Sequence, residues 1–148
     1  MTQEEKQLLI QEICARSPYK VKVQIDFGEH CIKYGIDRYV DDTVICVWPE
    51  TFEVGVNDED QACNIEDVKP YLRPMSSMTE EERDEIKEIC ADYLDEWENT
   101  ETVIDRWKLD AKTSYLRSEF YNSHHLDWNG LIEKGLALEA TEGMYVIK

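Results

Sequence analysis

The chain has 148 residues, of which 42% are hydrophobic and 33% are charged. This length and composition are typical of one folded domain. Its 16 Lys and Arg against 33 Asp and Glu give a formal net charge of −17. This charge argues against direct binding to nucleic acid and disfavours docking on anionic lipid, because both interactions depend on Lys and Arg at the surface.

Cysteine number and hydropathy restrict the class further. The five cysteines are odd in number and include no Cys-x-x-Cys pair, so we expect neither a disulfide framework nor a structural zinc site. No apolar stretch reaches the length of a membrane span, and the first residues lack a signal-peptide core. We expect a cytoplasmic protein with no metal, cofactor or membrane association.

The first half of the chain predicts a helix followed by strands. Residues 2–5 (TQEE) form a capping box, and an apolar stripe at helical spacing follows until Ser17-Pro18 ends it. Alternating apolar residues predict strands at 19–27, 32–36 and 52–56, with a break at Asp41-Asp42. The run 43–48 is apolar without alternation and predicts a central strand that is covered on both faces.

The middle of the chain changes character twice. Residues 57–67 are acidic and turn-prone, which predicts a solvated loop, and 68–74 carry Pro70 and Pro74, which predict a stiff, extended connector. A second capping box at 79–82 (TEEE) then begins the clearest amphipathic helix, over residues 79–98.

The C-terminal part is predicted to be mainly helical. Residues 102–109 fit either a helix or a short added strand, and the strand is favoured; helices are expected at 112–123 and at 131–137. The expected fold class is α+β, with an N-terminal helix on an antiparallel meander of about four strands, followed by a helical half. We expect a single domain, 1–148, in which residues 1–74 and 75–148 share one core.

Three separated runs carry a resemblance to a known family. Residues 13–19 (ICARSPY), 68–82 (VKPYLRPMSSMTEEE) and 124–140 (HHLDWNGLIEKGLALEA) resemble an uncharacterised family of short proteins from gut Bacteroides-type bacteria and their phages and prophages. The family commonly has an Arg where this chain has Asn129. The resemblance implies a mobile-element protein in a bacterial cytoplasm, and it implies no activity.

Two clusters carry side chains used in catalysis. His124, His125 and Asp127 could act as a general base with its orienting carboxylate, or hold a metal, but no zinc or hydrolase spacing accompanies them. The structural alternative is that one histidine caps a helix C-terminus. His30 and Cys31 would face opposite sides of a strand and are not expected to meet.

Acidic residues are concentrated on the helix expected at 79–98. Residues 79–101 hold 11 acids and two bases, more charge than solubility requires. Tyr71 and Arg73, on the connector, are either anchors for a partner or a bridge between the two halves of the core. The expected acidic contact consists of Glu80, Glu81, Asp84, Glu85, Glu88, Asp92, Asp95 and Glu96.

Three functions remain open on the sequence alone. The favoured hypothesis is a non-enzymatic interaction protein of a phage or mobile element that docks on a basic protein or complex, with mimicry of nucleic-acid charge as one form of docking. The first alternative is a small hydrolase or metal-dependent enzyme that uses His124, His125 and Asp127. The second is a structural or assembly component that associates with itself. The simplest interpretation of the charge is an ordinary solvated helix face that binds no partner.

Overall fold

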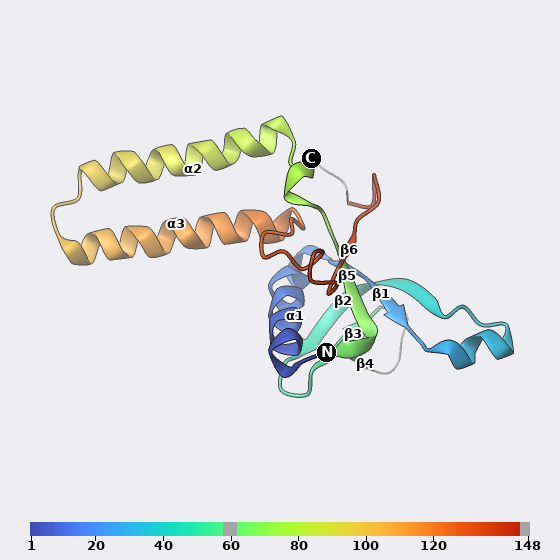
Figure 1. The fold of residues 1–148 in the computed structure, drawn as a ribbon. Helices are drawn as coiled ribbons and strands as arrows, with labels where there is room; N and C mark the ends of the chain where they lie inside the picture. The colour runs from blue at the N-terminus through green and yellow to red at the C-terminus, as the bar shows by residue number, and fades with distance from the viewer. Residues whose placement is uncertain (58–61, 146–148) are drawn as a thin grey trace.

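The computed structural model of the chain describes residues 1–57 and 62–145. Helix α1 (Gln3–Arg16) lies beside a twisted sheet, and two long helices, α2 (Glu80–Glu98) and α3 (Val103–Ser123), follow it in the chain (Figure 1). Both predicted capping boxes are present: Thr2 with Glu5 begins α1, and Thr79 with Glu82 begins α2. The predicted α+β fold class is confirmed.

The described residues form one sheet of six strands, in the order β4-β3-β2-β1-β5-β6. Strands β1 to β4 make an antiparallel meander of four strands, the number expected, although β4 was not predicted and the strand predicted at 32–36 is not part of it. Strand β5 adds antiparallel to β1, and β6 adds parallel to β5. The strands are β1 (Lys22–Asp26), β2 (Tyr39–Trp48), β3 (Glu53–Val56), β4 (Cys63–Asn64), β5 (Val68–Leu72) and β6 (Leu138–Glu139). Short 3-10 helices are η1 (Ser17–Tyr19), η2 (Glu29–Tyr34), η3 (Ile65–Asp67) and η4 (Met75–Ser77).

The hydrophobic core lies between α1 and one face of the sheet. Strand β1 shows why: Val23 and Ile25 are buried while Lys22, Gln24 and Asp26 are partly exposed, as strand alternation requires. The other buried members are Leu9, Ile10 and Ile13 from α1, Val44, Val54, Val56, Val68 and Leu72 from the strands, and Val21, Ile65, Leu131, Leu136 and Ala137 from connecting segments.

Two strand predictions in the first half are wrong. Residues 32–36 belong mostly to η2, at the tip of an arm between β1 and β2, where Ile32, Tyr34 and Ile36 are exposed (Figure 1). The expected break at Asp41-Asp42 lies inside β2, where these residues pair with β1. Alternation over a few residues cannot separate a strand from a turn of 3-10 helix when no core lies beneath it.

Strand β2 is not covered on both faces. The pairs Val44–Val56 and Cys46–Gly55 leave Ile45 as one extra residue, a β-bulge, and Ile45 points into solvent. The bulge interrupts the alternation of side chains. The apolar run at 43–48 therefore reflects a bulged strand with a partly exposed outer face, and the prediction of a doubly covered strand is wrong.

The expected connector at 68–74 is largely strand β5. Its Val68, Lys69 and Pro70 pair with β1, and Tyr71 and Leu72 pair with β6. The extended conformation that the prolines require is confirmed, but the segment lies inside the sheet. In the acidic segment before it, residues 58–61 lie outside the described residues, and 63–67 form β4 and η3 rather than loop.

The favoured strand at 102–109 is wrong, because α3 runs from Val103 to Ser123. Thr102 caps this helix, since its Oγ1 accepts a hydrogen bond from the Asp105 amide at 3.1 Å. Leu109 is buried in the first half of α3. Packing of α3 along α2 thus outweighs the strand preference of Val103, Ile104 and Trp107.

The expected helix at 131–137 is absent, and a series of turns takes its place. Gly130 and Gly135 have φ values of 72° and 73°, in the left-handed region. The Asp127 carboxylate accepts hydrogen bonds from the Leu131 and Ile132 amides at 2.7 and 3.0 Å. Leu131 and Leu136 are buried all the same, so the apolar spacing reflects core contact without a helix.

Helices α2 and α3 form an antiparallel hairpin that projects from the sheet and α1 (Figure 1). No residue of α2 or α3 belongs to the core cluster formed by the described residues. The hairpin meets the body at its base, near Arg73, Phe120 and Leu126. The single shared core expected from the sequence stays a prediction.

Candidate interaction surface on the helical hairpin

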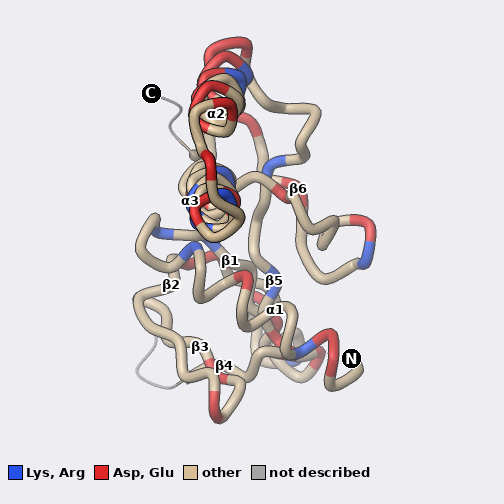
Figure 2. Tube along the Cα trace, turned by 90° about the vertical axis from the view of Figure 1, so that its left-hand side faces the viewer, with Lys and Arg blue, Asp and Glu red and all other residues tan. Residues whose placement is uncertain are grey.

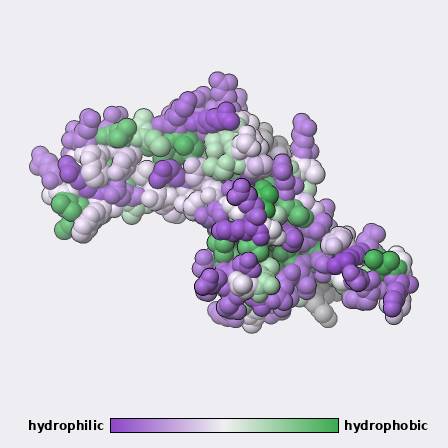
Figure 3. Space-filling model, in the orientation of Figure 1, coloured by the Kyte–Doolittle hydropathy of each residue, from purple (hydrophilic) through white to green (hydrophobic). Residues whose placement is uncertain are grey.

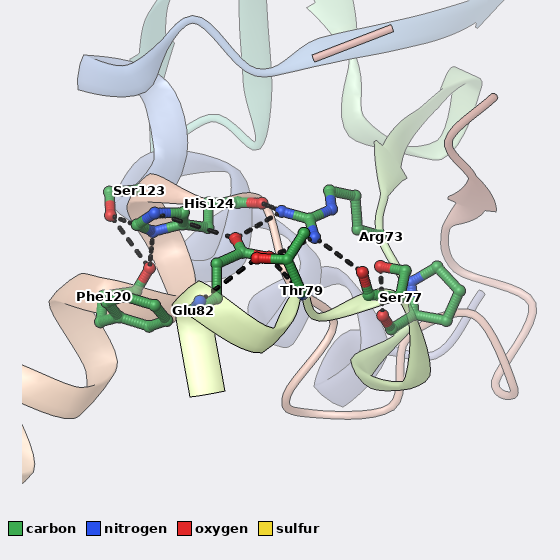
Figure 4. Close-up of polar contacts among 8 residues, drawn as sticks. Arg73, Ser77, Thr79, Glu82, Phe120, Ser123 and His124 are labelled. Atoms are coloured by element: carbon green, nitrogen blue, oxygen red, sulfur yellow. Dashed lines mark hydrogen bonds and ion pairs between the residues drawn. The ribbon is translucent and has the colours of Figure 1, made fainter. Parts of the chain in front are cut away.

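The hairpin is attached to the sheet by a buried ion pair. The Arg73 guanidinium, just after β5, donates two hydrogen bonds of 2.8 Å to the two carboxylate oxygens of Glu82 on α2 (Figure 4). Arg73 also donates to the backbone carbonyls of Ser77 at 3.0 Å and His124 at 3.2 Å. One side chain therefore ties together the start of α2, the end of α3 and the strand between them.

Glu82 has two roles in this arrangement. It is the third residue of α2, and its carboxylate accepts a hydrogen bond from the Thr79 amide at 2.8 Å to complete the capping box. The hydrogen bonds from Arg73 lower the pKa of the Glu82 carboxyl from 4.5 to about 2, although its burial acts in the opposite direction. Glu82 is therefore ionised at neutral pH and is not part of the exposed acidic surface.

The eight predicted contact acids all lie on α2 and are all exposed. We call them the acidic face: Glu80, Glu81, Asp84, Glu85, Glu88, Asp92, Asp95 and Glu96. Figure 2, which looks at the free end of the hairpin, shows acidic residues along α2 and a mixture of acidic and basic residues on α3. The charge is therefore concentrated on the outer helix of the hairpin.

Little of this charge is neutralised from within. Among the described residues, the ion pairs of the acidic face are Asp84 with Lys87 at 4.0 Å and Glu96 with Lys112 at 3.7 Å, both between exposed groups. Exposed ion pairs at such distances contribute little. The acidic face stays strongly negative.

Contacts between the two helices hold the acidic face in place. The Tyr93 hydroxyl donates to Asp110 Oδ1 at 2.5 Å, and the Arg106 guanidinium lies over the Trp97 ring at 4.7 Å. Within α2, the rings of Tyr93 and Trp97, which make these two contacts with α3, pack together at a centroid distance of 5.7 Å. These contacts join the middle and the free end of the hairpin, so the carboxylates are carried by a helix with a fixed neighbour.

Tyr71 and Arg73 do not lie on a partner-binding surface. The two residues are 8% and 6% exposed. The Tyr71 hydroxyl donates to Asp41 Oδ1 at 2.7 Å, and the Arg73 guanidinium is used by Glu82. The structure corresponds to the alternative in which these residues join the two halves, and the prediction of anchors for a partner is wrong.

The structure does not bring His124, His125 and Asp127 together as a catalytic group. The Asp127 carboxylate accepts hydrogen bonds from the backbone amides of Leu131 and Ile132 instead. His124 Nδ1 lies 2.8 Å from the carbonyl of Phe120 in the last turn of α3, and its ring stacks on the Phe120 ring. This is the capping role considered as the structural alternative.

His125 is buried and follows the end of α3 in a left-handed conformation, with φ of 57°. Its ring stacks on Tyr145 at 3.8 Å, and Nδ1 has no hydrogen-bond partner among the described residues. Burial lowers its pKa from 6.5 to about 4, with a further contribution from Arg16. Both histidines line a cavity of about 500 Å³ with Lys20, Lys22 and Tyr145, and Asp127 does not line it.

His30 and Cys31 do meet, against the sequence expectation. Because η2 is a 3-10 helix and not a strand, successive side chains do not alternate between two faces. His30 Nε2 lies 3.7 Å from Cys31 Sγ, which also contacts the Phe27 carbonyl at 3.5 Å.

Among the described residues, no group of three or more His, Cys, Asp or Glu is placed to hold a metal.

The sequence interpretation missed two features of the hairpin. The pairing of Arg73 with Glu82 has no local signal, because Glu at the third position of a capping box is ordinarily solvated. The second feature, the exposed apolar residues of α3, did have a local signal, since Ile104, Trp107, Ala111 and Tyr115 recur at helical spacing.

None of the helices in the described residues has both the length and the apolar character needed to cross a bilayer. Comparison of the chain with protein-family models, with curated proteins and with solved structures gives no match.

Proposed function

We propose that this protein is a non-enzymatic interaction protein that docks on a basic protein or complex through the acidic face of α2. The observation that carries the proposal is that all eight carboxylates of this face are exposed on one helix. Among the described residues, two of the eight form an ion pair, and each pairs weakly with an exposed lysine. A fixed array of like charges attracts a surface of opposite charge and steers its approach.

The hairpin supports this proposal in a second way. The helix that carries the charge projects from the body and is held by contacts with α3, so a partner can approach it without meeting the sheet (Figure 1). The sequence resemblance to proteins of Bacteroides-type bacteria and their phages gives the proposal its setting, the cytoplasm of a bacterium. A partner that ordinarily binds nucleic acid has a basic groove of the required sign.

The test compares two variants with the same change in charge. In the first, Glu85, Glu88, Asp92 and Asp95 are all replaced by Lys; in the second, the exposed Glu4, Asp37, Glu50 and Glu133 are replaced by Lys. Each immobilised protein is exposed to extract of a Bacteroides-type host, and bound proteins are identified by mass spectrometry at about 50 mM and 500 mM salt.

We expect the unaltered chain and the second variant to retain the same basic protein at low salt and to lose it at high salt. The first variant should lose it at both. Equal loss in both variants would mean that only net charge matters, and retention by the first variant would overturn the proposal. Competition by mixed-sequence duplex DNA would identify the partner's surface as a nucleic-acid site.

A further inference from the structure

The cavity of about 500 Å³ that contains the two histidines lies where three separate parts of the chain come together. It is lined by four of the residues 18–22, just after α1, by residues 123–125 at the end of α3, and by Met144 and Tyr145. None of these lining residues belongs to α2, so the cavity is separate from the acidic face. Its volume is in the range of about 300–1,000 Å³ that is usual for small-molecule sites.

The lining of the cavity is cationic, which is unusual for this chain. Lys20 and Lys22 both line it, and no Asp or Glu is among the described residues that do so. The cavities next in size, of about 330–350 Å³, each include at least one acid. Figure 3 shows a mostly hydrophilic surface, and acids outnumber bases by 33 to 16 in the sequence. A cavity with two bases and no acid therefore points to an anionic ligand.

Neither lysine is neutralised by an acid of the described residues, since no ion pair there involves Lys20 or Lys22. The Lys22 ammonium donates to the Met144 carbonyl at 3.0 Å, which uses one of its three N–H groups. Lys20 is exposed. Together the two ammonium groups balance a phosphate monoester, which carries a charge of about −1.5 to −2 at pH 7, whereas a single carboxylate would balance one of them.

His125 adds a polar atom without a partner. The residue is 5% exposed, and its Nδ1 has no hydrogen-bond partner among the described residues. Its pKa is lowered to about 4 by burial, with a further contribution from the positive charge of Arg16, so the neutral ring has one nitrogen that can donate. A buried polar atom without a partner costs free energy, and a ligand that pairs with it recovers that cost.

The backbone is strained at two residues of the same lining. Among the described residues, three that are not glycine have positive φ, and two of them, Lys20 and His125, line this cavity, each with φ of 57°. A side chain in the left-handed region costs free energy, and such residues are concentrated at ligand-binding and catalytic sites. The strain therefore agrees with a binding role for this cavity.

We propose that the cavity binds a small phosphate monoester that carries an apolar or aromatic group. The phosphate is held by the ammonium groups of Lys20 and Lys22 and accepts a hydrogen bond from the His125 ring. The apolar group packs on Tyr19 and Met144, which are half-buried in the lining. The proposal does not depend on the proposed function.

Charge favours a small ligand over a macromolecule rich in phosphate. A chain of net charge −17 repels nucleic acid and anionic lipid surfaces, which bring many phosphates close to it at once. A single phosphate in the cavity responds mainly to the groups around it, because physiological salt screens charges that are more than about 8 Å away. The two lysines therefore attract one phosphate group even though the chain as a whole is negative.

NMR titration of the full chain at constant pH tests this proposal, with phenyl phosphate as the probe. The chain has three histidines, and His30, on η2 of the arm, is an internal control for the two in the cavity. The imidazole resonances of His125 should shift to saturation with a dissociation constant of about 0.1–1 mM, and those of His30 should not shift. Inorganic phosphate, which lacks the aromatic group, and phenol, which lacks the phosphate, should each bind at least about tenfold more weakly.

Matched substitutions locate the site. Lys20→Gln and Lys22→Gln should each weaken binding of phenyl phosphate about three- to tenfold, because each removes one charge from the phosphate. Lys33→Gln makes the same change of charge on the arm and should leave the dissociation constant within about twofold. His125→Phe keeps a ring beside Tyr145 but removes the nitrogen, and it should also weaken binding. Circular dichroism checks that each variant keeps its helices.

Several outcomes would overturn the proposal. They are the absence of a saturable shift at about 20 mM phenyl phosphate, an equal shift of His30, equal binding of phenol, and an equal effect of Lys33→Gln. A peptide that carries phosphotyrosine should bind no more tightly than phenyl phosphate. Much tighter binding of the peptide would overturn the assignment of the cavity to a small molecule.

Discussion

At the scale of single residues, a few buried polar side chains determine how the hairpin is attached. Arg73 and Glu82 are nine residues apart, and each would be costly to bury alone. Together they satisfy the start of α2, the end of α3 and the turn at Ser77. Removal of either partner from a buried pair of this kind is strongly destabilising, because the other charge is then left buried without a counter-charge.

Glu82→Gln should therefore destabilise the protein by about 3 kcal/mol at pH 7, because the buried Arg73 guanidinium loses its counter-charge. Unfolding in urea, followed by circular dichroism, measures the change. The neighbouring Glu81→Gln removes an exposed carboxylate and should alter the free energy of unfolding by less than about 0.5 kcal/mol. Similar effects of the two substitutions would contradict the role given to the pair.

The same pair predicts a loss of stability in acid. The Glu82 carboxyl has a pKa of about 2 in the folded chain and about 4.5 when unfolded, so between these values the unfolded state binds more protons. This contribution is present above pH 4.5 and is lost as the pH falls toward 2. A series of urea titrations should show that the unaltered chain loses more stability over this range than Glu82→Gln does.

His125 predicts a second pH effect, at a higher pH. Its burial lowers its pKa to about 4, against 6.5 when unfolded, so it stays neutral in the folded chain while the unfolded chain takes up a proton. Its contribution to stability is present above pH 6.5 and is lost as the pH falls toward 4. Imidazole resonances followed by NMR should show His125 titrating near 4 in the folded protein, and titration near 6.5 would contradict its burial.

At the scale of elements, some features are determined by local sequence signals and others by tertiary contacts. Both capping boxes begin their helices where the sequence places them, because the bonds that define them lie within four residues. The end of β2 shows the opposite case, since the bulge at Ile45 depends on pairing with β3. Gly55 on β3 belongs to the same irregularity, as it lies beneath the Cys46 and Trp48 side chains.

Gly55→Ala should destabilise the sheet by about 1–3 kcal/mol, because the added methyl group would overlap Cys46 Sγ and lie 3.1 Å from the Trp48 ring. Thermal unfolding measures the loss. The double substitution Gly55→Ala with Cys46→Ala should recover part of it, since the overlap with sulfur is then removed. Full stability of the single variant would show that β2 and β3 do not approach as closely as described.

At the scale of the whole molecule, the distribution of charge is the dominant feature. A net charge of −17 on a folded chain raises its free energy through self-repulsion, and the acidic face concentrates part of that charge on one helix. The hairpin limits the cost by holding this helix away from the sheet.

Screening should therefore stabilise the molecule. Raising sodium chloride from about 10 to 300 mM should increase the midpoint of thermal unfolding by roughly 3–5 °C, equivalent to about 1 kcal/mol for a chain of this size. The variant with Glu85, Glu88, Asp92 and Asp95 changed to Lys should show a smaller rise, because less repulsion remains. A fall in the midpoint with salt would mean that ion pairs outweigh repulsion.

The sequence by itself determined the features that depend on neighbours in the chain. These are the α+β class, the capped starts of α1 and α2, the inward face of β1 and the exposed acids of α2, all of which follow from spacing and local hydrogen bonds. The spacing of apolar residues shows which side of a helix or strand faces the core. This spacing predicts the type of an element well when the element packs directly on that core.

Only the tertiary structure decided the rest. The placement of β5 within the sheet, the pairing of Arg73 with Glu82, the extension of α3 to Val103 and the separation of Asp127 from the histidines each depend on residues distant in the chain. The physical reason is that desolvation, pairing and packing energies arise where segments meet. Propensity over a few residues is too weak to fix these outcomes.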